Sequence, residues 1–213
     1  SSCAPDADDV AIDPQAAAAL LALTRTDLPP PHRRTPAQAR RAVAGYAALQ
    51  GAAEPVARVV DVAGPVPLRV VRPRDGGRLP ALVHFHGGGW VAGDRDLYDR
   101  PARALARHTG HAVVLVDYRR APEHRFPVPL DDCCAATRWV VEHAPELGLD
   151  PARVGVSGDS AGGNLAAAVC LRLRAEGGPS PAAQVLLYPV TDHAMDTPSY
   201  RTYAEGFGLS AAA

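Results

Sequence analysis

Lysine is absent from the chain of 213 residues, and aromatic residues make up only 5% of it. The 22 basic residues are balanced by 23 acidic ones, so the formal net charge is −1. A surface with so little net charge and so few rings for base stacking argues against binding to nucleic acid or to an anionic membrane. The apolar fraction of 47% is that of an ordinary globular domain, and the length suffices for one sizeable core.

Long apolar runs are also missing, since no stretch approaches the roughly 18 residues that a membrane span requires. Residues 1–10 are polar and acidic and lack the apolar core of a signal peptide. We therefore expect no membrane span and a cytoplasmic location, with the absent initiator methionine indicating a trimmed start.

Cysteine is scarce, and the full set is Cys3, Cys133, Cys134 and Cys170. Their spacing matches neither a disulfide framework nor a zinc-binding pattern. We expect buried or half-buried free thiols in a reducing compartment, and nothing calls for a metal or an organic cofactor.

Residues 1–50 are predicted to form a helical arm without a core of its own. The run 14–24 is rich in alanine and leucine and predicts a short helix. Thr35 followed by Pro36 is typical of an N-cap with proline at the first helical position, so a second helix is expected from there to about Leu49.

Strands alternate with helices in the rest of the chain. Strands are expected over 56–62 and 68–72, joined by a hairpin turn at Gly64-Pro65, and then over 81–86, 112–117, 154–157 and 183–188. Helices are expected over 99–108, 130–141 and 161–175. Apolar, β-branched strands that alternate with helices predict an α/β fold, with a mainly parallel sheet covered on both faces.

Ser160 stands at the centre of the pentapeptide 158–162, GDSAG, between a predicted strand and a predicted helix. A G-x-S-x-G match alone is a weak signal, but in this context it predicts a nucleophile elbow. The flanking glycines allow a sharp turn that exposes the hydroxyl beside a helix N-terminus, where developing negative charge is favoured.

A second motif, HGGGW at 86–90, directly follows the predicted strand 81–86. Successive glycines expose backbone N–H groups, so Gly88 and Gly89, together with the N–H of Ala161, are expected to form an oxyanion hole. A flexible or phosphate-binding glycine loop is the alternative interpretation. It is disfavoured because no lysine follows and no G-x-G-x-x-G pattern is present.

These motifs stand in a familiar order. HGGGW at 86–90, DYRRAPEHRFP at 117–127, Asp131-Asp132, GDSAGGN at 158–164 and Tyr188-Pro189 together resemble the hormone-sensitive lipase-like esterases, the bacterial family IV carboxylesterases of the α/β-hydrolase fold. The resemblance runs from about residue 35 to the last residue. It implies an N-terminal helical cap over 1–50, a hydrolase core over 51–190 and the start of a second cap segment over 191–213.

The resemblance implies a role for each motif residue. Ser160 matches the nucleophile, and Gly88, Gly89 and Ala161 match the donors of the oxyanion hole. His86 would brace the oxyanion loop, and Trp90 would lie beside the acyl pocket. A supporting group would order the loops around the nucleophile: Asp117, Tyr118, Arg119, Glu123 and Asp159. The chain departs from the family at Arg120 and Arg125.

The triad acid and histidine of the family are expected to be absent from this chain. In α/β-hydrolases both follow the nucleophile on later strands, but one helix and one strand occupy 161–188. The C-terminal strands therefore look missing, and the chain is expected to be an inactive piece of a longer enzyme. His193 is the one histidine after Ser160, and it is a weak candidate for the base.

The resemblance implies a serine carboxylesterase that hydrolyses short- to medium-chain esters through an acyl-enzyme on Ser160. The expected partner is a small-molecule ester, and a homodimer is compatible with the sequence. The alternative is a non-catalytic small-molecule binding protein or receptor on the same fold. The two differ in the catalytic histidine, which the family places in the C-terminal part that looks missing here, so the sequence leaves both open.

Overall fold

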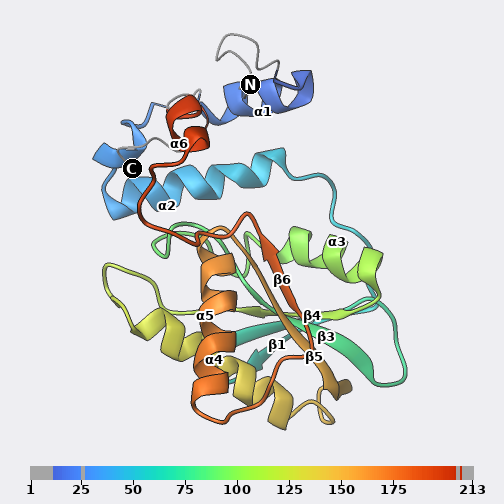
Figure 1. Cartoon of the computed structure of the whole chain (residues 1–213). Coiled ribbons are helices and arrows are strands. Elements are labelled where there is room, and N and C mark those ends of the chain that lie inside the picture. The colour runs from blue at the N-terminus through green and yellow to red at the C-terminus, as the bar shows by residue number, and fades with distance from the viewer. Residues whose placement is uncertain (1–11, 25–26, 205–206, 208–213) are drawn as a thin grey trace, which may run out of the picture. The chain divides into compact units, whose positions relative to one another are not determined.

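The computed structural model describes residues 12–24, 27–204 and 207 (Figure 1). The chain separates into two compact units, one of residues 50–191 and one of residues 1–49 and 192–213. The first unit contains a sheet with its covering helices, and the described part of the second is helical. The assignment of residues 1–50 and 191–213 to a cap and of residues 51–190 to a hydrolase core remains a prediction.

The larger unit is built on a six-stranded sheet (Figure 1). Its strands are β1 (Arg58–Ala63), β2 (Pro67–Arg72), β3 (Leu79–Phe85), β4 (Ala112–Val116), β5 (Leu149–Asp159) and β6 (Gln184–Leu187), and their spatial order is β1-β2-β4-β3-β5-β6. Neighbours from β4 to β6 run parallel, whereas the β1–β2 hairpin joins β4 antiparallel. The predicted α/β fold with a mixed, mainly parallel sheet is confirmed.

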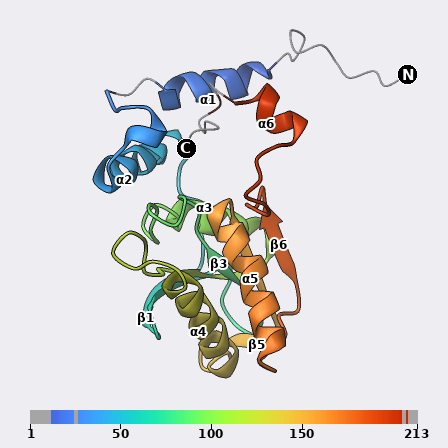
Figure 2. The ribbon, with the colours of Figure 1, turned by 60° about the vertical axis from the view of Figure 1, so that its left-hand side comes forward.

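Helices cover both faces of this sheet. The three are α3 (Asp99–Thr109), α4 (Val128–Glu142) and α5 (Ala161–Ala175). The larger core joins Val83 and Phe85 of β3 to the buried faces of α4 and α5, which Figure 2 shows side by side in front of the sheet. A smaller core on the opposite face packs α3 against β2 and β4. The carboxyl ends of β3 and β5 therefore emerge between two packed layers.

The observed elements follow the predicted ones closely, with one clear difference in β5. The helix 161–175 has the expected bounds, and the strand–turn–strand at Gly64-Pro65 forms the predicted hairpin. Strand β5 begins at Leu149, five residues before the expected start. After the buried Leu149, residues 150–153 are partly or fully exposed, so the apolar pattern identified only the continuous buried part from Val154.

The described part of the smaller unit contains α1 (Pro14–Thr24), α2 (Pro36–Ala44), α6 (Pro198–Thr202) and two 3-10 turns, η2 (Pro31–Arg33) and η3 (Gly45–Leu49). The predicted cap at Thr35 is present, and Gln38 completes a capping box by accepting the Thr35 N–H at 2.9 Å. The single helix expected to Leu49 is wrong at its end, because α2 ends at Ala44 and the chain continues as η3. The helix expected from 209 lies outside the described residues.

The described cysteines are free, as predicted from their spacing. Cys133 and Cys134 lie buried on α4, Cys170 is half-buried on α5, and Cys3 lies outside the described residues. A search of the described helices finds none with the length and apolar character needed to cross a bilayer.

Candidate active site

Ser160 lies in a strained turn between the end of β5 and the start of α5. Its φ of 53° and ψ of −119° fall in a region that residues with a side chain rarely adopt. The surrounding backbone fixes this conformation. The Ser160 N–H donates to the Leu187 carbonyl at 2.9 Å, and the Ser160 carbonyl accepts from the Asn164 N–H at 3.0 Å. The predicted strand–turn–helix context of the G-x-S-x-G motif is therefore present.

The turn is tight enough to exclude side chains at both flanking glycines. A β-carbon on Gly158 would lie 2.2 Å from the Gly162 carbonyl oxygen. A β-carbon on Gly162 would lie 2.0 Å from the carbonyl oxygen of Phe85, the last residue of β3. Helix α5 thus begins directly against the end of the central strand, beside the start of the glycine loop.

The loop after β3 folds into a compact turn. The Gly88 carbonyl accepts hydrogen bonds from the N–H groups of Val91 and Ala92, at 3.2 and 2.9 Å. Among the described residues, none accepts a hydrogen bond from the N–H of Gly88, Gly89 or Ala161. The structure therefore leaves unused the three donors that the sequence assigns to an oxyanion hole.

His86 is buried at the base of this loop. Its Nδ1 donates to the Gly87 carbonyl at 2.8 Å, and its ring stacks on Tyr118 at a centroid separation of 4.2 Å. The Tyr118 hydroxyl in turn donates to the His86 carbonyl at 2.7 Å. Burial lowers the pKa of His86 to about 4, so the ring is neutral at pH 7. These contacts brace the loop and do not direct the ring to Ser160.

Asp159 precedes the serine and turns its side chain toward the glycine loop. Its Oδ1 accepts from the Gly87 N–H at 3.0 Å, and its Oδ2 accepts from the Tyr98 hydroxyl at 2.8 Å. Burial alone would raise the pKa of this carboxyl, but His84, Tyr98 and the Gly87 N–H together hold it below the ordinary value. The turn at Ser160 and the glycine loop are therefore joined by an ionised carboxylate.

Trp90 ends the glycine motif and contacts the 117–127 segment. Trp90 is half-buried against the larger core, and its carbonyl accepts from the Ala121 N–H at 2.9 Å.

The arginines of the 117–127 segment differ in their contacts. Arg120, where the family has leucine, donates to the Gly93 carbonyl. Arg119 binds the buried Asp132 through both its backbone N–H, at 2.9 Å, and its guanidinium, at 2.7 Å. Arg125 is exposed.

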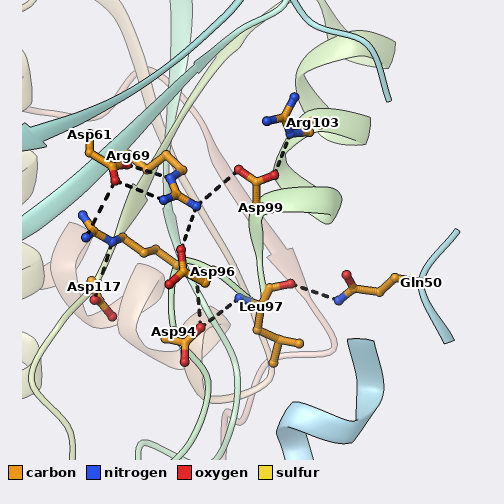
Figure 3. Close-up of polar contacts among 10 residues, drawn as sticks. Gln50, Asp61, Arg69, Asp94, Asp96, Leu97, Asp99, Arg103 and Asp117 are labelled. Carbon is orange, nitrogen blue, oxygen red and sulfur yellow. Dashed lines mark hydrogen bonds and ion pairs between the residues drawn. The ribbon is translucent and has the colours of Figure 1, made fainter. Parts of the chain in front are cut away.

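An ionic network holds the segment that leads from the glycine loop into α3 (Figure 3). Arg69 of β2 contacts three carboxylates: Asp61 at 2.7 Å, Asp96 at 2.9 Å and Asp99 at 3.4 Å. Hydrogen bonding to Arg69 lowers the pKa of Asp61. Burial raises the pKa of Asp117, which lies 4.0 Å from the Arg95 guanidinium at the edge of the same network.

Two residues beside the site carried no motif in the sequence. Tyr98 stands in a plain polar turn before α3, and its contact with Asp159 depends on the tertiary fold. His84 lies on β3 next to Asp159 of β5. The alternation of β3 places His84 on the face opposite Phe85, but only the pairing of β3 with β5 shows what it faces.

The described residues do not present a base to the serine. None of them makes a hydrogen bond with the Ser160 hydroxyl. His193 belongs to the smaller unit, is fully exposed, and places its Nδ1 3.5 Å from Asp192 Oδ1. Within the described part of the chain, no three His, Cys, Asp or Glu side chains gather in a way that could hold a metal ion.

Comparison with known proteins identifies the family of the chain. A family model described as the alpha/beta hydrolase fold matches residues 82–213. The carboxylic ester hydrolase LipN of Mycobacterium tuberculosis is 48% identical over 153 residues, which cover 70% of this chain and 41% of LipN. The carboxylesterase NlhH of the same species is 48% identical over 143 residues, covering 66% of this chain and 44% of NlhH. The chain thus spans less than half the length of these curated relatives.

Solved structures give the same result. An ester hydrolase from the metagenome of Lake Arreo superposes with a TM-score of 0.87 at 38% identity, over 95% of this chain and 68% of that one. The hyperthermophilic esterase of Pyrobaculum calidifontis gives 0.88 at 36% identity, over 94% and 67%. Both the fold and the resemblance to the hormone-sensitive lipase-like esterases are confirmed, and the chain belongs to the alpha/beta hydrolase fold family.

Proposed function

We propose that the full-length protein hydrolyses carboxylic esters through an acyl-enzyme on Ser160. The strained backbone of Ser160 carries this proposal, because such strain persists only where the surroundings impose it and is concentrated at functional sites. The N–H groups of Gly88, Gly89 and Ala161, which donate to no acceptor among the described residues, support it. The names of the relatives point to the same reaction class.

The proposed reaction has two steps. Ser160 Oγ loses its proton to a general base and forms a bond to the ester carbonyl carbon, and the oxyanion binds the free N–H groups of the loop and of Ala161. The carbon–oxygen bond to the alcohol then breaks, and the alcohol leaves with the proton. Water attacks the acyl-enzyme, returns a proton to Ser160 through the same base and releases the acid.

We assign supporting roles to the residues around this chemistry. His86 and Asp159 hold the glycine loop through Gly87, and Trp90 borders the acyl pocket beside it. The proposed substrates are small esters with short or medium acyl chains. This chain length follows the resemblance to a family with a small cap and is a proposal about the whole protein.

The decisive experiment measures hydrolysis of p-nitrophenyl acetate, butyrate and laurate by the full-length protein and by its Ser160→Ala variant. We expect turnover of the acetate and butyrate esters, weaker turnover of the laurate, and loss of activity in the variant. Retained activity in Ser160→Ala would overturn the assignment of the nucleophile. Tight ligand binding without turnover by the full-length protein would instead indicate a binding protein on the same fold.

A further inference from the structure

A row of buried polar side chains lies on the α3 face of the sheet, beneath the elbow. His84 of β3 and Ser157 of β5 are register partners in adjacent parallel strands, so their side chains leave the same face. Asp159 follows two residues after Ser157 and returns to that face. His84, Ser157 and Asp159 are each less than 10% exposed, and Tyr98 at the start of α3 borders them.

The distances within this row define which imidazole nitrogen carries the proton. His84 Nδ1 lies 3.0 Å from Ser157 Oγ, and His84 Nε2 lies 3.6 Å from Asp159 Oδ1. An unprotonated Nε2 would direct its lone pair at an ionised carboxylate, which is unfavourable in a buried site. Nε2 therefore carries a proton that faces Asp159, and Nδ1 shares a hydrogen bond with Ser157 Oγ.

We propose that His84 is a positioning residue that orients Asp159 and, through it, the oxyanion loop at Gly87. This inference rests on the proposed function, because it assigns the loop to the oxyanion. The oxygen of Asp159 that faces His84 is the one that accepts the Gly87 N–H. Tyr98 holds the other oxygen, so the carboxylate is fixed from two sides and cannot rotate away from Gly87.

Gly87 connects the fixed Asp159 carboxylate to the N–H groups of Gly88 and Gly89. It directly precedes Gly88, and a β-carbon on Gly87 would lie 2.4 Å from Asp159 Oδ2, so the loop and the carboxylate are in close contact. A small rotation of Asp159 would shift the N–H groups of Gly88 and Gly89. Such a shift would weaken oxyanion binding in the transition state more than it would weaken substrate binding.

The kinetic test uses three variants of the full-length protein with p-nitrophenyl acetate. His84→Phe keeps a planar ring but removes both hydrogen-bonding nitrogens, and we expect kcat to fall about tenfold with KM changed by less than about twofold. His84→Gln restores a donor and an acceptor and should recover most of the lost kcat. Leu82→Met, on the same strand face without polar contacts, is the matched packing control and should leave both parameters near wild type.

The outcomes separate this inference from the proposed function. Equal losses in His84→Phe and His84→Gln, or an unchanged kcat in His84→Phe, would overturn the positioning role while hydrolysis itself stands. A parallel fall in kcat for Leu82→Met would show that packing alone is responsible and would also overturn it. Absence of hydrolysis in the wild-type protein concerns the proposed function, and the positioning contacts are then decided spectroscopically.

Nitrogen NMR of the histidine rings provides that readout without any substrate. We expect the His84 ring of the wild-type protein to carry a proton on Nε2, and its signals to shift in Asp159→Asn and in Ser157→Ala. Full-length protein with the His84 proton on Nδ1, or with signals insensitive to both substitutions, would contradict the proposed contacts.

Discussion

Gly162 approaches Phe85 so closely that a β-carbon on the glycine would lie 2.0 Å from the Phe85 carbonyl oxygen. The first turn of α5 and the last residue of β3 are therefore in direct contact. Because Ser160 begins that helix and the glycine loop continues that strand, this contact joins the two halves of the candidate site. Backbone contacts therefore bring the two halves of the candidate site together, independently of the side chains that line it.

Because the backbone of Ser160 is strained, a substitution that removes the strain should increase stability even though it abolishes activity. Ser160→Gly should abolish ester hydrolysis and raise the free energy of unfolding by about 1 kcal/mol or more, because glycine adopts φ 53° and ψ −119° without steric cost. The measurement combines activity on p-nitrophenyl butyrate with urea unfolding of the full-length protein.

Ser160→Ala is the matched control for this experiment. It also removes the hydroxyl but keeps the β-carbon and with it the strain, so it should be inactive without the gain in stability. If Ser160→Ala and Ser160→Gly were stabilised equally, the gain would come from loss of the hydroxyl and not from relief of the backbone.

Two neighbouring glycines of the oxyanion loop should respond differently to the same substitution. Gly88 has a φ of +119°, and a β-carbon there would lie 2.2 Å from the Ala92 carbonyl oxygen. Gly88→Ala should therefore displace the turn and lower kcat by about 100-fold or more, the effect of losing an oxyanion donor.

Gly89→Ala serves as the comparison. Gly89 has a φ of +61°, which alanine adopts at a cost of about 1 kcal/mol. Apart from its two chain neighbours, no described residue has an atom within 4 Å of the added carbon. We expect a modest loss of stability and a kcat within about tenfold of wild type. Equal losses of kcat in the two variants would show that the open space beside Gly89 is needed for catalysis.

Local signals in the sequence predicted much of this fold. The helix 161–175 follows from a turn motif before an alanine-rich run, and the start of α2 follows from Thr35 and Pro36. Such features depend on residues a few positions apart. The end of α2 was harder to predict, since Ala47, Ala48 and Leu49 favour a helix, yet the segment that begins at Gly45 forms a 3-10 turn.

The sequence identified the candidate nucleophile and the glycine loop, but not the contacts that hold them. Tyr98 and His84 belong to no motif, and each acts through a partner more than 60 positions away in the chain. Their roles depend on the pairing of β3 with β5 and on the packing of α3. Neither is encoded in a short window of residues, so sequence patterns alone could not reveal them.

Arg69 should contribute to stability because it is shared by three carboxylates (Figure 3). Arg69→Met keeps the aliphatic part of the side chain but leaves Asp61, Asp96 and Asp99 without their common cation. We expect the free energy of unfolding to fall by about 1–2 kcal/mol, measured by urea unfolding at low salt. High salt should reduce the difference, since it screens repulsion among the exposed carboxylates.

Arg153→Met is the control for loss of a single surface ion pair. Arg153 contacts only Asp150 among the described carboxylates, at 2.7 Å, and more than half of its side chain is exposed. Its substitution should leave the free energy of unfolding, measured in the same way, nearly unchanged. A loss as large as that of Arg69→Met would show that the shared geometry of Arg69 adds nothing to an ordinary surface pair.

Because the His86 ring is buried in its neutral form, we expect the protein to lose stability in mildly acidic solution. Its pKa is about 4 in the folded protein, because burial disfavours the charged ring, and about 6.5 in the unfolded chain. Between these values the unfolded chain binds more protons, so the free energy of unfolding falls as the pH drops from about 6.5 to about 4. The full loss attributable to this ring is about 3 kcal/mol.

His86→Phe keeps a ring to stack on Tyr118 but cannot titrate, so urea unfolding of both proteins at several pH values isolates this contribution. The variant should lose less stability than the wild type over that interval. Asp159 does not obscure the comparison, because its lowered pKa places its own effect at more acidic pH, and it is present in both proteins. Identical pH profiles would mean that the His86 ring accepts a proton as readily in the folded state as in the unfolded chain. The ring would then not be buried and neutral in the folded protein in solution.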